Sequence, residues 1–184
     1  MKFDAYASAI ENHYVTHWAT PVRRETLSPG RVHELPNQFE VLVFRRNNTT
    51  SYATKCMSLP ADNDRLELHL LDDANSPFRP ELVELMMTVA HFHRTGSALG
   101  LGHSVDFGRP WIVGATCSYG LVSLPYLDGP KLEWLAEPRV RFLWVVPITE
   151  QEREFKKAHG TEALEQRLEA AQFNYLDPAR SSVV

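Results

Sequence analysis

The segment from Tyr119 to Glu150 constrains the fold more than any other part of this chain of 184 residues. An apolar run from Cys117 to Leu124 is followed by Pro125 and by a Gly129-Pro130 break, and a second apolar run extends from Val140 to Val146. Short apolar runs that are bounded by turn residues are typical of buried strands. The second run is apolar at successive positions, so we expect it to lie centrally, with both of its faces covered.

Three further strands are predicted upstream. The segments Phe39–Arg46, Ser51–Leu59 and Arg65–Asp73 are rich in β-branched, aromatic or alternating apolar residues, and polar turn residues separate them. Such short connections favour an antiparallel meander. The preceding region, Val22–Asn37, contains Ser28-Pro29-Gly30 and is expected to form a loop or a short edge strand.

Helices are expected at both ends of the chain and in its middle. Apolar residues recur every three or four positions between Phe3 and Trp18, and again between Pro80 and Gly96. Thr149 and Glu152 have the spacing of a capping box, which predicts a helix that begins near Glu150. Gly160 and Thr161 mark a stop and a restart before a last helix that ends near Ala171. Together these patterns predict an α+β fold, with a mixed, largely antiparallel sheet packed against helices in a single domain over residues 1–184.

Three separated blocks resemble the suppressor-of-fused domain family. They are residues 100–111 (GLGHSVDFGRPW), 119–150 (YGLVSLPYLDGPKLEWLAEPRVRFLWVVPITE) and 175–184 (YLDPARSSVV). The resemblance implies a mixed α/β sandwich and a protein that binds a partner rather than an enzyme. Eukaryotic relatives sequester a transcription factor through strand addition and surrounding pockets, and bacterial stand-alone members of this length are similar to immunity proteins of polymorphic toxin systems. We expect the bacterial type, because the additional C-terminal domain of the eukaryotic form has no counterpart in this sequence.

Composition argues against several classes of ligand. The net charge is −4 and no run of Lys or Arg exceeds two residues, so nucleic acid is not expected as a partner, whereas a basic protein partner would be favoured. No apolar window approaches the roughly 20 residues that span a bilayer, and the acidic N-terminal region does not resemble a signal peptide. Cys56 and Cys117 lack metal-ligand spacing and are predicted to be reduced core thiols, as in a cytoplasmic protein.

Histidine groups raise the alternative of a small metal-dependent hydrolase. His91, His93 and His103 lie near Asp106 in sequence, but two positions apart on a helix place His91 and His93 on opposite sides. His13 and His17 share a helix face without a visible third ligand. The spacing therefore does not favour a metal site or another cofactor site.

Nucleophilic and nucleotide chemistry are disfavoured as well. The chain has no GxSxG motif, Cys117 is expected in a buried strand, and the glycine-rich stretch at residues 96–102 is not followed by Lys-Ser or Lys-Thr. We therefore expect no enzymatic activity. A regulatory or structural subunit of a larger assembly remains a further alternative.

The residues predicted to contact a partner lie in two loops. Phe107, Arg109 and Trp111 belong to the longer glycine-rich segment from Gly96 to Gly120, and Tyr126 and Asp128 belong to the turn at residues 123–130. Aromatic and Arg side chains contribute disproportionately to interface energy, although aromatic residues beside Gly and Pro also pack beneath loops as core. Strand addition at an uncovered sheet edge is a second possible mode, and the sequence does not identify that edge.

Overall fold

A mixed β-sheet organises the protein. The computed structural model describes residues 2–26 and 35–184, and the predicted turn at Ser28-Pro29-Gly30 lies outside these ranges. Within them the strands are β1 (Arg23–Thr26), β2 (Glu40–Arg45), β3 (Thr49–Lys55), β4 (Leu66–Asp73), β5 (Ser104–Asp106), β6 (Tyr119–Ser123), β7 (Trp134–Leu135) and β8 (Val140–Ile148). Their order is β1-β2-β3-β4-β8-β6-β5, and β7 pairs with β8 outside this path.

The predicted meander is confirmed. Strand β2 pairs with β3 and β3 with β4, both antiparallel, and β1 adds to the outer side of β2. Strand β8 lies centrally, as expected from its apolar sequence, with β4 on one side and β6 on the other. The β4–β8 pair is parallel, with Leu68 beside Leu143, and this pairing makes the sheet mixed.

Five helices pack around this sheet within the described residues. They are α1 (Phe3–Trp18), α2 (Pro80–Thr95), α3 (Pro130–Glu133), α4 (Glu150–His159) and α5 (Thr161–Ala170). The long N-terminal helix, the central helix and the helix break at Gly160 are confirmed. The short elements α3, β5 and β7 were not predicted, since two to four residues carry too little periodicity. No helix among the described residues is both long and apolar enough to cross a membrane.

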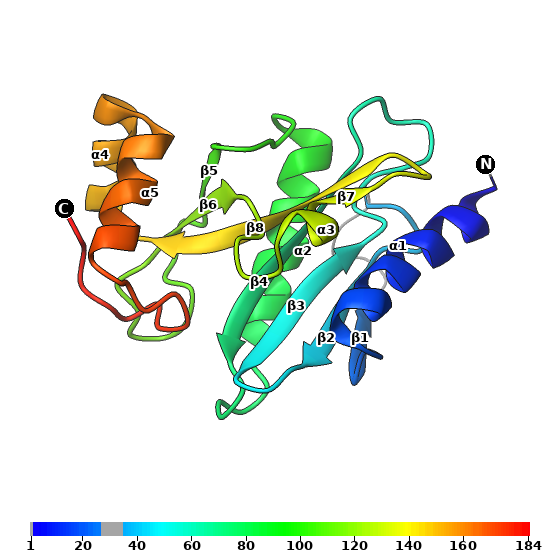
Figure 1. Ribbon diagram of the computed structural model, residues 1–184, viewed down its shortest axis with the longest axis horizontal. Coiled ribbons are helices and arrows are strands. Elements are labelled where there is room, and N and C mark those ends of the chain that lie inside the picture. The colour runs from blue at the N-terminus through cyan, green and yellow to red at the C-terminus, as the bar shows by residue number, and fades with distance from the viewer. Residues whose placement is uncertain (1, 27–34) are drawn as a thin grey trace.

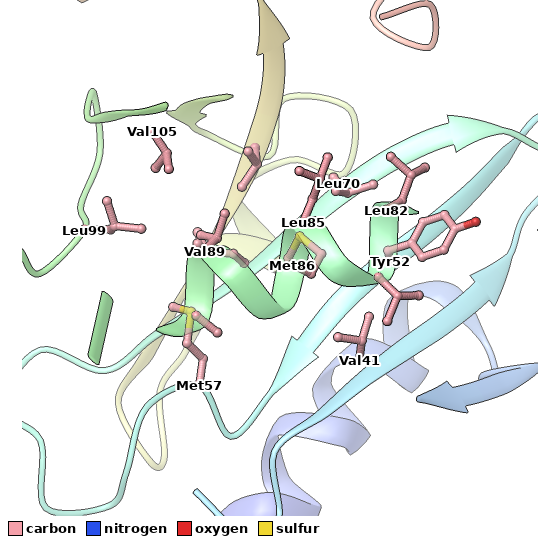
Figure 2. Close-up of a cluster of buried hydrophobic side chains, with 14 of the residues drawn as sticks. Val41, Tyr52, Met57, Leu70, Leu82, Leu85, Met86, Val89, Leu99 and Val105 are labelled. Atoms are coloured by element: carbon pink, nitrogen blue, oxygen red, sulfur yellow. The ribbon is translucent and has the colours of Figure 1, made fainter. Parts of the chain in front are cut away.

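Helix α2 covers one face of the sheet. Leu82, Leu85, Met86 and Val89 are buried along one side of the helix, and they belong to the same core cluster as Leu70 of β4 (Figure 2). Val41 of β2, Tyr52 of β3 and Val105 of β5 belong to this cluster too. The apolar stripe predicted for α2 is therefore buried in the core on this face of the sheet.

The opposite face is covered by two separate layers. Helix α1 lies at one end of the sheet, and α4, α5 and the C-terminal tail lie at the other end (Figure 1). The α1 layer buries Tyr14 and Trp18 against Phe44 and Phe142, whereas the α5 layer buries Leu164 and Leu168 with Val146. The loop between β6 and α3 lies between these layers, because its Asp128 accepts from Trp18 of α1 and its Tyr126 donates to Glu165 of α5.

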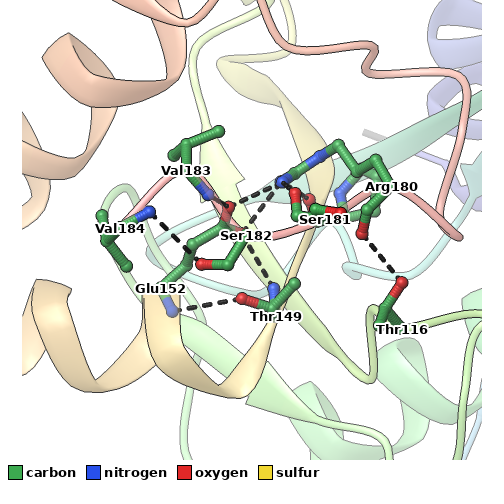
Figure 3. Close-up of polar contacts among 9 residues, drawn as sticks. Thr116, Thr149, Glu152, Arg180, Ser181, Ser182, Val183 and Val184 are labelled. Carbon is green, nitrogen blue, oxygen red and sulfur yellow. Dashed lines mark hydrogen bonds and ion pairs between the residues drawn. The ribbon is translucent and has the colours of Figure 1, made fainter.

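A buried ion pair fastens the C-terminal tail. Arg180 donates from Nη1 to Oε1 of Glu152 over 2.6 Å and from Nη2 to Oε2 over 2.9 Å, and the Glu152 side chain is fully buried (Figure 3). Glu152 also closes the predicted capping box, because it accepts from the Thr149 N–H over 2.8 Å. Arg180 lies within the block at residues 175–184 that carries the family resemblance, and Glu152 lies two residues after the end of the block at residues 119–150.

Gly120 is required by close packing in β6. A Cβ atom at this position would lie 2.7 Å from Cγ1 of Val145 and 3.1 Å from the ring of Phe107. We expect Gly120→Ala to lower the free energy of unfolding by about 1–3 kcal/mol, because the stiff Val145 side chain cannot move aside. Urea unfolding of this variant beside Gly100→Ala checks the prediction, since a Cβ at Gly100 meets no atom within 4 Å. Equal stability of the two variants would contradict it.

Candidate functional site

The predicted residues of the glycine-rich stretch are largely structural. Trp111 is only 1% exposed and donates from Nε1 to the Tyr119 carbonyl over 2.9 Å, while Phe107 packs edge-on against it at 5.6 Å between ring centroids. Arg109 is partly exposed and contacts the Glu84 carboxylate at 3.4 Å, which ties this loop to α2. Trp111 therefore lies in the core and offers no surface to a partner.

The two predicted residues of the β6–α3 loop have different roles. Asp128 is buried at the side chain and accepts from Trp18 Nε1 over 2.8 Å, and its Oδ1 also lies 2.6 Å from Arg46. These contacts attach the loop to α1. Tyr126 and Leu127 are 59% and 49% exposed. Asp128 thus anchors the loop, and the two residues before it face outward.

A groove lies between this loop and helix α5, and we refer to it as the α5 groove. It encloses about 460 Å³. Its floor is formed by Leu121 of β6 with Trp144 and Val146 of β8, and these side chains belong to the same core cluster as Leu168 of α5. Tyr126 and Leu127 form one wall. The groove therefore combines an apolar base with an exposed aromatic edge, which is common in binding sites.

The other wall of the α5 groove is acidic. Glu162, Glu165 and Glu169 line it from α5, and no Lys or Arg lines it among the described residues. Glu165 accepts a hydrogen bond from Ser123, and it also accepts one from the Tyr126 hydroxyl over 3.3 Å. Partial burial, and then the Glu165 charge, raise the pKa of Tyr126, so this hydroxyl stays protonated and continues to donate.

One buried donor in the groove is unpaired within residues 2–26 and 35–184. The indole Nε1 of Trp144 makes no hydrogen bond with any described residue, although Trp144 is only 4% exposed. The Trp144 ring itself is held edge-on by Tyr175 of the tail at 5.5 Å. Buried polar groups without partners are uncommon in folded proteins and often occur at functional sites.

Three of the histidines considered as metal ligands form hydrogen bonds with the backbone. His13 Nε2 bonds the Leu132 carbonyl over 2.8 Å, and His17 Nδ1 bonds the His13 carbonyl over 2.8 Å. His93 Nδ1 accepts from the Leu99 N–H over 2.9 Å. Among residues 2–26 and 35–184, no group of three or more His, Cys, Asp or Glu is placed to hold a metal ion.

Neither cysteine is activated. Burial raises the pKa of the Cys56 thiol to about 12 and that of the Cys117 thiol to about 11. A nucleophilic cysteine requires the opposite shift, toward the thiolate at neutral pH. The two thiols are therefore packing groups of the core, as the sequence predicted.

The acidic wall was missed by sequence reasoning. Glu162, Glu165 and Glu169 are spaced by three and four residues, so they share one face of α5. That spacing is visible in the sequence, but an acidic helix face is ordinarily a solvated one. Only the fold shows that this face borders an apolar floor.

The fold and the groove define an α+β protein with a mixed sheet, helix α2 on one face, and a divided second face that holds a groove beside α5. A family model described as Suppressor of fused protein (SUFU) matches residues 36–181. This chain belongs to the SUFU family, which confirms the resemblance of the three sequence blocks.

Solved structures share this fold. A SUFU homologue from Neisseria gonorrhoeae FA 1090 is similar to this chain at 29% identity and a TM-score of 0.84, over 98% of both chains. A chain of the Sufu–Fu complex has 14% identity and a TM-score of 0.70, and the alignment covers 98% of this chain and 91% of that chain.

Drosophila Suppressor of Fused has 14% identity and a TM-score of 0.71, over 96% of this chain and 50% of that chain. This chain therefore spans half the length of the Drosophila protein. At such identities the likeness concerns the fold. No curated protein matches this chain.

Proposed function

We propose that this chain is a non-catalytic protein-binding domain whose α5 groove receives a positively charged segment of a protein partner. The observation that carries the proposal is the acidic wall of Glu162, Glu165 and Glu169 above an apolar floor. A Lys or Arg side chain would lay its aliphatic stem on Leu168 and Trp144 and its charge near the carboxylates. The exposed Tyr126 would add an aromatic contact.

Two further points support a protein partner. One structural relative was solved as the Sufu–Fu complex, so a chain of this fold is part of a protein complex in that case. The net charge of −4 also favours encounter with a basic partner. We further propose that the partner is a toxin of a polymorphic toxin system, which this chain neutralises as an immunity protein. We place this role in the cytoplasm, where the free Cys56 and Cys117 would remain reduced.

The groove is tested by reversing its exposed charges. We expect Glu162→Lys with Glu169→Lys to weaken partner binding by about tenfold or more, because two attractive charges become repulsive. Glu165 is left unchanged because it holds Tyr126 and Ser123. The matched control is Glu137→Lys with Glu154→Lys, which reverses two exposed charges outside the groove.

The experiment begins with capture of the partner from native lysate by the tagged chain, followed by a titration of the purified pair. Wild type and control should bind equally, and the groove variant should bind more weakly. Equal binding by all three would exclude the α5 groove. The immunity role is tested by growth, since cells that express the partner alone should die and cells that also contain the wild-type chain should survive. A harmless partner would contradict that role.

A further inference from the structure

A second cavity is lined by arginines and lies apart from the α5 groove. It encloses about 380 Å³ between the start of β4, the β7–β8 hairpin and the segment that follows α2. Arg65, Arg139 and Arg141 line it together with Trp134, and Asp64 is the one carboxylate among its lining residues. We refer to it as the arginine cavity. An excess of guanidinium groups is unusual here, because the chain as a whole is acidic.

Two of these guanidinium groups have no carboxylate partner in the part of the chain that the structure describes. Arg141 is paired with Glu133 at 2.8 Å, but neither Arg65 nor Arg139 forms an ion pair with any described residue. Most other arginines of the protein do form such pairs, for example Arg94 with Asp62 and Arg46 with Asp128. Arg65 and Arg139 therefore keep donors available for a ligand.

Arg65 is oriented although it lacks an acidic partner. Its Nη2 donates to the Pro60 carbonyl over 2.6 Å, which fixes the plane of the guanidinium. Its Nε is buried and has no hydrogen-bond partner among the described residues. A buried donor on a fixed guanidinium is costly to leave unpaired, and an oxyanion is the ligand that best satisfies it.

Trp134 adds an aromatic surface to the cavity. Its ring centroid lies 5.7 Å from the guanidinium carbon of Arg139 and 5.2 Å from that of Arg141, and the side chain is 43% exposed. The two arginines are held beside the ring by cation–π contacts. Charge and aromatic surface are thus presented side by side at the cavity.

We propose that the arginine cavity binds a small oxyanion group, a phosphate or a carboxylate, through Arg65 and Arg139 with Trp134 beside it. The volume suits a small molecule or one side chain of a larger ligand. Arg guanidinium matches both anions through paired N–H donors. This site is separate from the α5 groove, and the proposal stands whether or not the groove binds a protein.

Trp134 provides the readout. Of the four tryptophans, Trp18, Trp111 and Trp144 are at most 4% exposed, so a soluble quencher reaches mainly Trp134. We expect iodide to quench the fluorescence about two- to fivefold more strongly than caesium, because the arginines concentrate anions around the ring. Trp134→Phe should abolish the iodide-sensitive part of the emission.

Binding is then measured by titration with inorganic phosphate and, separately, with citrate. At least one should give a saturable change in Trp134 emission with a Kd of about 1 mM or below, and should protect the ring from iodide. Saturation by phosphate alone would assign a phosphate site, and saturation by citrate alone a carboxylate site. No saturation by either anion up to about 10 mM would overturn the proposal.

Variants separate binding from nonspecific charge effects. Arg139→Gln should raise the Kd by about fivefold or more and reduce the excess of iodide quenching, while the midpoint of unfolding stays unchanged because Arg139 is exposed. The matched control, Lys157→Gln, removes one exposed charge on α4 and should bind as wild type does. Equal Kd values for Arg139→Gln and wild type would also overturn the assignment.

Discussion

Replacing Arg180 by methionine is expected to lower the free energy of unfolding by about 3–5 kcal/mol. The Glu152 carboxylate is fully buried, and Arg180 supplies two of its four hydrogen bonds. Methionine keeps much of the length of the arginine side chain but leaves the carboxylate as a buried charge without a cation. Such an uncompensated charge is far more costly than a lost surface contact.

Replacing Arg180 should also loosen the C-terminal tail and the loop that precedes β6. Arg180 also donates to the Pro147 carbonyl over 3.0 Å, and its own carbonyl accepts from Thr116 Oγ1 over 2.8 Å (Figure 3). Releasing Arg180 therefore weakens contacts on β8 and before β6. For a chain of this size the expected loss corresponds to a fall in Tm of about 6–20 °C.

Chemical denaturation of Arg180→Met, Glu152→Leu, their double variant and a control measures the effect. Arg167→Met removes an exposed arginine on α5 and should change stability by less than about 0.5 kcal/mol. The double variant Glu152→Leu with Arg180→Met should lose less than the sum of the two single changes, because no lone buried charge remains. A loss below about 1 kcal/mol for Arg180→Met would show that the ion pair does not hold the tail.

The parts of the fold that could be predicted from sequence depend on local patterns. The apolar stripe between Phe3 and Trp18 and the alternation in β4 each lie within one element, so their periodicity is readable. The parallel contact between β4 and β8 is different. More than sixty residues separate the paired Leu66 and Arg141, and the sequence of neither strand indicates which strand it pairs with. Pairing of this kind is decided by the whole topology.

The candidate site shows the same limit. Trp111 and Tyr126 both lie beside proline in loops, yet Trp111 is in the core and Tyr126 is 59% exposed. The difference arises because Trp111 bonds the Tyr119 carbonyl, whereas Asp128 fixes the second loop and leaves Tyr126 outward. The acidic residues of α5 became a candidate site only when the fold placed them beside β6 and β8. Burial at a loop depends on such non-local contacts.

Two buried ionisable groups on β4 should have opposite effects on stability as the pH changes. Glu67 accepts from Thr54 and from the Met57 and Ser58 N–H groups, yet its complete burial raises its pKa to about 7 from a model-peptide value of 4.5. Burial lowers the pKa of His69 to about 4 from 6.5. Both side chains are held in their neutral forms by the same loss of water.

The signs follow from proton binding. Between pH 4.5 and 7 the folded protein holds a proton on Glu67 that the unfolded chain has lost, so stability from this group is present below pH 4.5 and is lost as the pH rises. Between pH 4 and 6.5 the unfolded chain holds a proton on His69 that the folded protein lacks, so stability from this group is lost as the pH falls. Each effect amounts to roughly 3 kcal/mol, and the two oppose each other.

We therefore expect the contributions of Glu67 and His69 to the free energy of unfolding of the wild type to cancel almost completely between pH 4.5 and 6.5, where the two effects overlap. Glu67→Gln should become more stable as the pH rises through this range, because Glu67 then no longer opposes His69, and the lowered pKa values of His13 and His93 act in the same direction as that of His69. His69→Gln should become less stable as the pH rises, by up to roughly 3 kcal/mol.

Urea unfolding at intervals across this range gives the three profiles, with His159→Gln, an exposed histidine on α4, as the matched control. The slopes are diagnostic, because a substitution that only disturbs packing lowers stability equally at every pH. Slopes of opposite sign would show that both groups are neutral in the folded protein. Parallel profiles for the wild type and both variants would mean that neither group changes its proton affinity on folding. In that case Glu67 would be a buried carboxylate stabilised by its hydrogen bonds alone.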